Sequence, residues 1–126
     1  KNKKIIVNGG SQIRPQLHID DMIRCYLFFL KNKRSGIFNL GFENFSIIKI
    51  AHLIKKNLSK CKIKRNNSLD VRSYRLYAQK IRSIGFRPTK NSMHAIKDLI
   101  QNYKFNKIFK RKTNYRSIYL SKYLKN

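Results

Sequence analysis

One stretch, residues 9–21, constrains the fold of this 126-residue chain more than any other. A strand-like run over 4–7 leads into two glycines, which permit a sharp turn that other residues resist. Pro15 favours an extended backbone at Arg14, so we expect the arginine side chain to project from the turn. A fixed guanidinium beside a turn suits an anionic ligand such as a diphosphate. The same residues also fit an ordinary connector between a strand and a helix.

A helix is predicted to follow over residues 20–30, with Asp20 as its N-cap and Asp21 in its first turn. Its side chains are apolar almost all round, and such a helix needs burial on more than one side. The rest of the chain has few residues to cover it. We therefore expect a missing partner, which is either another domain or another subunit.

The charge balance is extreme: 30 lysines and arginines stand against 5 acids, giving a net charge of +25. Such an excess indicates an anionic partner, namely nucleic acid, a lipid surface or a phosphorylated small molecule. The lysines are spread along the chain, however, which also fits a compositional bias. Because the acids are so few and fall within motifs, we expect them to make specific pairs, except Asp98, which we expect to be solvated on a helix.

Cysteine and histidine spacing predicts no metal site, since Cys25 and Cys61 lie far apart and the three histidines are scattered. We expect both thiols to be reduced and the location to be cytoplasmic. No signal peptide is recognised, and the longest apolar run, 25–30, is too short for a bilayer, which needs about 20 residues. Because the chain begins with lysine, we expect it to be a piece of a longer protein.

Apolar periodicity and capping residues predict the remaining elements of a small mixed α/β domain over residues 1–103. They are an extended segment over 17–19, a strand over 36–41, a helix over 47–58 capped by Ser46, an edge strand over 62–64, a helix over 78–84 closed by Gly85, and a helix over 93–103 capped by Ser92. Residues 104–126 form a separate tail, in which cations alternate with aromatic residues.

Three motifs in this order resemble the extended short-chain dehydrogenases, the NAD-dependent epimerases and dehydratases of nucleotide sugars. The resemblance covers roughly residues 5–103. The motifs are Gly9-x4-Arg14-x3-His18-Ile19-x-Asp21, then Asn39-Leu40-Gly41 followed by Ser46 and Ala51, then Asp70-x-Arg72-x-Tyr74 followed by Lys80-Ile81 and Gly85-Phe86-x-Pro88.

The resemblance implies a substrate-binding segment of that α/β fold, lacking most of the Rossmann domain. It implies that Arg14 and Arg72 bind the diphosphate of a nucleotide sugar, and that Arg65, Tyr74 and Asn39 are possible substrate contacts. The family often has Arg-Pro-Gly where this chain has Arg65-Asn-Asn, so the shape of that loop differs. The complete enzyme would be a cytoplasmic isomerase or lyase, expected to form a homodimer.

Two parts of such an enzyme are absent from the sequence. There is no glycine-rich turn at a helix N-terminus to hold NAD, and no convincing Tyr-x-x-x-Lys pair for proton transfer. The resemblance therefore implies a carboxyl-terminal portion with no catalytic residues and no turnover alone. It also implies that this portion binds no cofactor by itself and that the complete enzyme uses NAD. The alternative is a basic nucleic-acid-binding module, and the tail could instead meet an anionic membrane.

Overall fold

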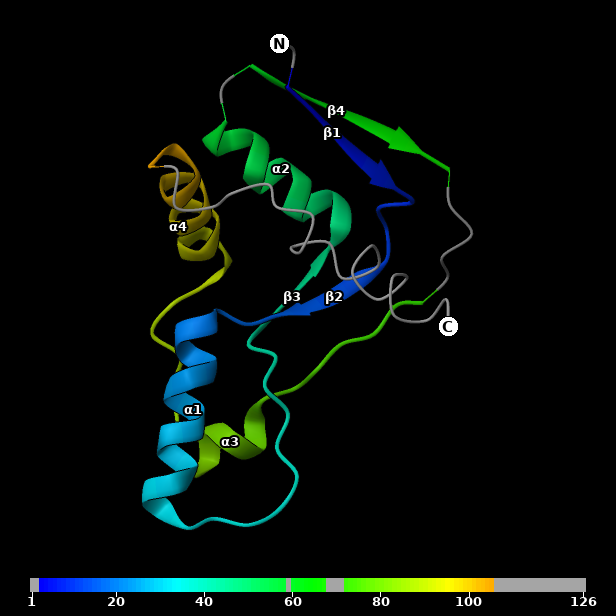
Figure 1. Ribbon diagram of the computed structural model, residues 1–126. Helices are drawn as coiled ribbons and strands as arrows, with labels where there is room; N and C mark the ends of the chain where they lie inside the picture. Colours follow the sequence, from blue (N-terminus) through cyan, green and yellow to red (C-terminus); the bar gives the residue numbers. More distant parts are fainter. Residues whose placement is uncertain (1–2, 59, 68–71, 106–126) are drawn as a thin grey trace, which may run out of the picture.

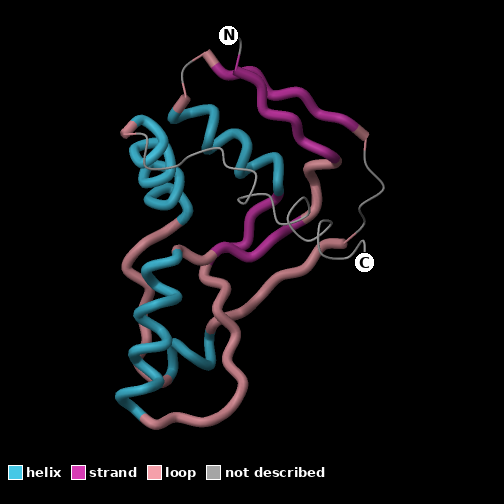
Figure 2. The backbone as a smooth tube through the Cα atoms, in the orientation of Figure 1, coloured by secondary structure: helices cyan, strands magenta, loops and turns pink. Residues whose placement is uncertain are grey.

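The computed structural model describes residues 3–58, 60–67 and 72–105 (Figure 1). Asp70 and nearly all of the basic tail lie outside these ranges. Four helices and four strands are formed by the described residues, which makes the chain a small mixed α/β unit as predicted. The backbone tube in Figure 2 shows strands gathered in one half of the molecule and α1 with α3 in the other.

A parallel pair joins β1 (Lys3–Asn8) to β4 (Cys61–Asn66). Helix α2 (Ile47–Asn57) lies beside this pair and contacts both strands, and α4 (Ser92–Lys104) contacts α2. The predicted strands over 4–7 and 62–64 are confirmed, and the predicted helix over 47–58 ends one residue earlier. Ser46 caps α2 as predicted, because its side chain accepts a hydrogen bond from the Lys49 amide.

The second pair is antiparallel and joins β2 (Ile13–Gln16) to β3 (Glu43–Ser46). It lies between the β1–β4 pair and the half of the molecule that contains α1 (Figure 1). The predicted extended segment over 17–19 is right at His18, whose backbone is extended, but β2 ends at Gln16 and α1 begins at Ile19.

Helix α1 spans Ile19–Asn32, and His18 rather than Asp20 is its N-cap. The predicted cap is wrong because the His18 ring nitrogen Nδ1 accepts the Asp20 amide at 3.1 Å. Asp20 and Asp21 instead occupy the first turn, where carboxylates favour the helix dipole. Lys33 closes the helix in a left-handed conformation, with φ of 44°.

The predicted strand over 36–41 is wrong, since residues 35–42 form an irregular connection between α1 and β3. A strand requires a neighbouring strand for its backbone hydrogen bonds. The loop instead places Phe38, Leu40 and Phe42 against the apolar side of α1 and α3. These three side chains are thus partly buried by packing without any sheet, whereas Ile37 of the same loop is exposed.

The last two helices are α3 (Gln79–Ser83) and α4 (Ser92–Lys104). Gly85 follows α3 with φ of 97°, the left-handed conformation expected of a glycine after a helix. The predicted cap of α4 is wrong by one residue. Asn91 is the N-cap, and its side-chain oxygen accepts the Met93 and His94 amides at 3.1 Å.

One apolar cluster is centred on Cys25, Ala78, Ile81 and Phe86, and aromatic rings surround it. The Phe28 ring meets the Phe86 ring edge-on, with centroids 5.6 Å apart. Cys61, in contrast, is buried in β4, in the other half of the molecule. Both cysteines are free thiols, as predicted.

Candidate functional site

The turn between β1 and β2 is fixed by side chains on both sides of it. Gly9 and Gly10 take φ of 72° and 114°, which only glycine adopts readily. The buried Gln12 side chain accepts the Gly10 amide and donates to the Asn8 carbonyl at 2.9 Å. Arg65 donates its Nε to the Gly9 carbonyl. This turn delivers the chain into β2 in a defined direction.

Arg14 and Arg72 meet at the edge of β2, although 58 residues separate them in sequence. The Arg14 guanidinium donates to the Arg72 carbonyl and to the Ile13 carbonyl, the latter at 3.0 Å. It also lies over the Tyr74 ring, 5.2 Å from the centroid. The Arg14 side chain thus reaches from β2 to the segment that begins at Arg72, where it is half-buried and bonded to backbone.

The segment 72–77 is held against β2 and β3 by hydrogen bonds of its backbone and of the Ser73 and Asn44 side chains. The Tyr74 amide donates to the Ile13 carbonyl at 3.3 Å, and the Ser73 hydroxyl accepts the Ile13 amide at 3.0 Å. Asn44 of β3 exchanges two hydrogen bonds with Leu76, at 2.9 and 3.0 Å. The segment therefore presents an exposed row of arginine and tyrosine side chains on a fixed backbone.

Gly41 is the point at which three segments touch. A Cβ atom on Gly41 would lie 2.6 Å from the Leu76 Cβ and 2.9 Å from the Pro15 Cβ. Any side chain there would push the segment 72–77 away from β2. The glycine of the Asn-Leu-Gly motif thus allows the loop to pass close to β2 and to the segment 72–77.

The structure brings together three of the five predicted site residues, namely Arg14, Arg72 and Tyr74. Arg65 instead contacts the glycine turn that precedes β2, where it donates to the Gly9 carbonyl. Asn39 is exposed in the loop between α1 and β3 and is not part of this group of contacts. Arg14, Arg72 and Tyr74 are called the arginine edge below.

The acids perform a different task, in which each makes specific pairs that stabilise the fold. Asp21 is fully buried and accepts hydrogen bonds from the Thr89 amide and hydroxyl, the Lys90 amide and the Arg24 guanidinium. Burial alone would raise the pKa of Asp21, but these hydrogen bonds outweigh it and hold the pKa below its ordinary value. Asp21 therefore anchors the segment that leads into α4.

Lys90 is the centre of a second group of charges. Its ammonium lies 2.7 Å from Asp20 Oδ2 and 3.3 Å from Asp98 Oδ2, and His18 Nε2 is 3.2 Å from the same Asp98 oxygen. The expectation that Asp98 is a solvated helix residue is wrong, and hydrogen bonding to Lys90 lowers its pKa. His18 and the two carboxylates are close enough to hold a metal ion, but the Lys90 ammonium already bonds to both carboxylates.

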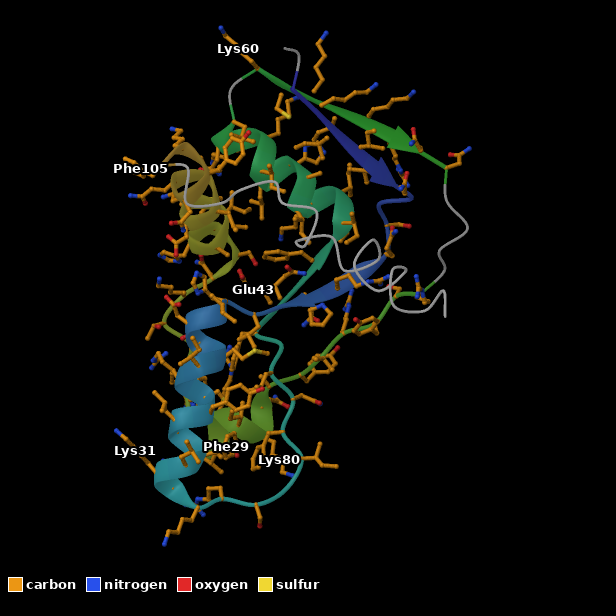
Figure 3. All side chains as sticks on the ribbon, viewed as in Figure 1. Phe29, Lys31, Glu43, Lys60, Lys80 and Phe105 are labelled. Atoms are coloured by element: carbon orange, nitrogen blue, oxygen red, sulfur yellow. The ribbon has the colours of Figure 1, made fainter. Side chains whose placement is uncertain are left out.

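Glu43 completes the pattern, because its Oε2 accepts both the Ser92 amide and the Ser92 hydroxyl at 2.6 Å. Figure 3 shows Glu43 in the middle of the molecule, whereas Lys31 and Lys60 point outward from its ends. Three of the four described acids therefore bind the segment 89–98, and the fourth, Asp98, lies within it. Each is occupied by a structural contact, and none is placed beside the arginine edge as a general acid or base.

The arrangement of helices and strands is that of part of an extended short-chain dehydrogenase, which confirms the predicted resemblance at the level of fold. The chain superimposes on dTDP-glucose 4,6-dehydratase from Bacillus anthracis str. Ames in complex with NAD, with a TM-score of 0.72 and 24% identity. It also superimposes on ADP-L-glycero-D-manno-heptose-6-epimerase from Helicobacter pylori, with a TM-score of 0.69 and 20% identity.

The likeness covers 82% and 79% of this chain but only 35% and 32% of the two enzymes, so the chain spans about a third of their length. No family model matches the sequence, and no curated protein matches it. Among the described residues, each helix is too short or too polar to cross a membrane.

Proposed function

We propose that the chain is the nucleotide-sugar-binding portion of an NAD-dependent sugar epimerase or dehydratase and that it has no turnover alone. The observation that carries the proposal is the arginine edge, where Arg14 and Arg72 come together on a fold shared with two nucleotide-sugar enzymes. A diphosphate carries two negative charges on adjacent phosphates. In this proposal the guanidinium groups of Arg14 and Arg72 both turn to the diphosphate and match its charge, and the Tyr74 ring provides an aromatic face for a base or sugar.

In this proposal the described residues of the chain do not hold NAD. Its glycine turn leads into strand β2 and not into a helix N-terminus, and the Gly10 amide is taken by the Gln12 side chain. A dinucleotide pyrophosphate would need such amides. We therefore assign NAD to the part of the complete enzyme that this chain does not span, and with it the proton-transfer groups.

The test is calorimetric titration of the chain with dTDP-glucose near physiological salt. We expect binding that the Arg72→Ala variant weakens by about tenfold to a hundredfold, since a charge-assisted hydrogen bond contributes roughly 1.5–3 kcal/mol. Arg14→Lys keeps the charge but lacks the planar fork, so we also expect weaker binding. Addition of NAD should produce no conversion of the sugar.

The matched control is Arg34→Ala, which removes one positive charge from an exposed residue in the loop that follows α1. If Arg34→Ala and Arg72→Ala reduce the affinity equally, the ligand recognises net charge and not the arginine edge. Tight binding that neither arginine of the edge affects would also contradict the proposal.

A second candidate function is nucleic-acid binding. Tyr74 and Tyr77 are both more than half exposed and alternate with Arg72 and Arg75, a pattern suited to base stacking beside phosphate contacts. Binding to mixed-sequence single-stranded DNA with a steep salt dependence, lost in a Tyr74→Ala, Tyr77→Ala variant, would favour this function.

For the complete enzyme we propose a homodimer in the cytoplasm. The free cysteines favour a reducing compartment. The substrate is a nucleotide-diphosphate sugar in this proposal, and the reaction is an epimerisation or a dehydration.

A further inference from the structure

Helix α1 is covered on one side only. Its inner side contacts the cluster around Cys25, whereas five large apolar residues on other positions are each more than half exposed. We call these residues the α1 outer face: Ile19, Ile23, Tyr26, Leu27 and Leu30. Residues 19, 23, 27 and 30 recur every three or four positions and form a straight stripe about 17 Å long. An apolar surface of this kind on a chain this charged indicates a covering partner.

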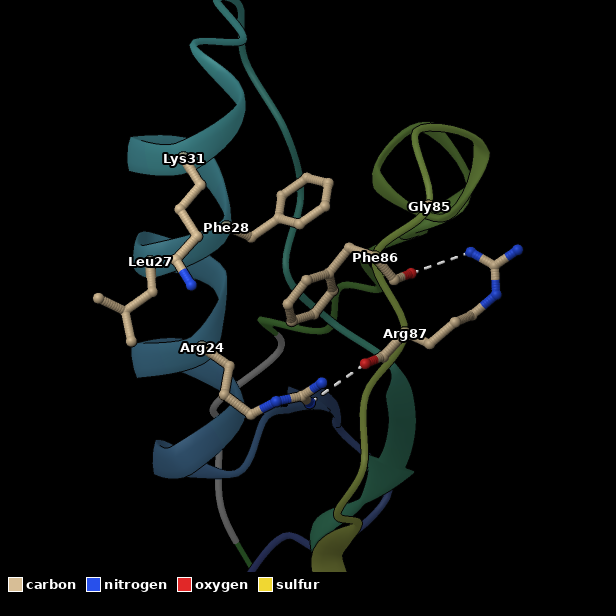
Figure 4. Close-up of a pocket in the computed structure, with 7 residues that line it drawn as sticks. All are labelled: Arg24, Leu27, Phe28, Lys31, Gly85, Phe86 and Arg87. Carbon is tan, nitrogen blue, oxygen red and sulfur yellow. Dashed lines mark hydrogen bonds between the residues drawn. The ribbon is translucent and has the colours of Figure 1, made fainter.

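A cavity of about 300 Å³ adjoins this face, between α1 and the loop at Gly85–Arg87 (Figure 4). The Phe28 and Phe86 rings form its apolar wall, and Leu27 belongs to both the cavity and the outer face. A volume of this size accepts one large side chain of a partner. A flat lipid surface would leave the cavity unfilled. The presence of a cavity beside the apolar stripe therefore favours a protein segment over a bilayer.

Charge decides which protein segment fits. Residues 22–42 contain Arg24, Lys31, Lys33 and Arg34 and no acid. Arg24 is paired with Asp21, but Lys31 forms no ion pair with any residue in the described part of the chain. Lys31 also lines the cavity, where its side chain runs back along α1 toward Leu27 (Figure 4). The partner that complements this end of the face is therefore acidic.

We infer that the α1 outer face and the adjoining cavity form a docking surface for an acidic amphipathic helix of another polypeptide region. The partner's apolar stripe covers Ile23, Leu27 and Leu30, as two helices pack through residues three and four apart. Its carboxylates face Lys31 and the cations that follow it. A second copy of this chain is a poor partner, because each copy carries a net charge of +25. This surface is distinct from the arginine edge and does not depend on nucleotide-sugar binding.

The test uses three synthetic peptides of about 18 residues, roughly 27 Å long when helical. The first has a leucine stripe flanked by glutamates, the second has the same stripe flanked by lysines, and the third has the glutamates without the stripe. Fluorescence anisotropy is measured with the full chain at about 0.15 M NaCl, where distant charges are screened. We expect the first peptide to bind at least tenfold more tightly than either of the others.

Variants of the chain locate the binding. Leu27→Glu should weaken binding of the first peptide at least tenfold, and circular dichroism checks that this exposed substitution leaves the fold intact. Lys31→Glu should weaken it several-fold more than Lys56→Glu, which makes the same charge change on an exposed lysine in the last turn of α2.

Three outcomes would overturn the inference. The first is equal loss in the two lysine variants with no effect of Leu27→Glu, which marks binding by net charge. The second is dimerisation in sedimentation experiments that Leu27→Glu abolishes, which marks a second copy as the partner. The third is flotation with anionic vesicles that depends on Leu27, without selective binding of the first peptide.

Discussion

At the scale of single residues, Gly41 shows how little space separates the elements of the arginine edge. The backbone of the loop passes between Pro15 of β2 and Leu76 of the exposed segment, and only a hydrogen atom fits there. The position of Arg72 and Tyr74 beside Arg14 therefore depends on a residue that contacts no ligand.

We predict that Gly41→Ala destabilises the protein by about 1–3 kcal/mol, the usual cost of forcing an extra carbon into close contact. The φ of Gly41 is not positive, so the cost arises from the contacts at 2.6 and 2.9 Å and not from the backbone conformation. Urea unfolding followed by circular dichroism measures the change. Ser35→Ala, in the exposed part of the same loop, should be nearly neutral. A neutral Gly41→Ala would contradict the close approach.

At the scale of elements, the junction between α1 and α4 depends on carboxylates. Asp21 binds Thr89 and Lys90, Glu43 binds Ser92, and Lys90 bonds to Asp20 and Asp98. Hydrogen bonds to a buried carboxylate are among the more costly ones to break, because the remaining donors lose their partner. The attachment of α4 should therefore respond to substitution and to pH.

We predict that Asp21→Asn destabilises the protein by about 3 kcal/mol at neutral pH. The folded-state pKa of Asp21 is lowered, so its contribution is fully present above the ordinary carboxyl pKa and is lost as the pH falls through the folded-state value. The difference in unfolding free energy between wild type and variant should therefore shrink in acid.

Urea titrations at neutral pH and near pH 3 measure that difference. The half-exposed neighbour supplies the control, since Asp20→Asn should cost less than about 1 kcal/mol. A difference that is constant over this pH range would show that Asp21 is not bound as a carboxylate.

Local signals in the sequence predicted the four helices and the strands β1 and β4, but not β2 or β3. Ser46, Gly85 and the glycine turn were found because their roles depend on adjacent residues. The strand predicted over 36–41 does not form. A strand needs a neighbouring strand for its backbone hydrogen bonds, and a local sequence pattern does not show whether one is present. The cap at Asn91 was missed by one residue, since asparagine and serine cap equally well.

The candidate site was predictable in composition but not in contacts. The order of motifs predicted a shared diphosphate site for Arg14 and Arg72, which stays a prediction, and the structure joins the Arg14 guanidinium to the Arg72 backbone carbonyl. The scarcity of acids indicated specific pairs, but their partners are up to 80 residues away, as for His18 and Asp98, and no local spacing identifies them. The hydrogen bond from Arg14 to the Arg72 carbonyl could not be predicted either, because it depends on where residues 72–77 pass in the folded chain.

At the scale of the whole molecule, the described acids are all used within the fold, so the exposed surface is overwhelmingly cationic. Like charges on a compact chain repel one another and destabilise it. The carboxylate contacts at the junction are short and partly buried, so salt should weaken them less than it weakens the repulsion between exposed lysines.

We predict that the melting temperature rises by several degrees between about 0.01 M and 0.3 M NaCl, because the screening length falls across this range. Differential scanning calorimetry measures the change, and sucrose at matched osmolality controls for solvent exclusion. A melting temperature that falls with added NaCl would show that the ion pairs around Lys90 outweigh the surface repulsion.

The two cysteines lie in different halves of the molecule, Cys25 on α1 within the aromatic cluster and Cys61 on β4. Burial raises the pKa of the Cys25 thiol, so this sulfur reacts with an alkylating reagent only when its surroundings open. The alkylation rates of the two thiols therefore measure how often each half of the native molecule opens. One reports the loosening of the helical half and the other the loosening of the strand half, with no label added to the protein.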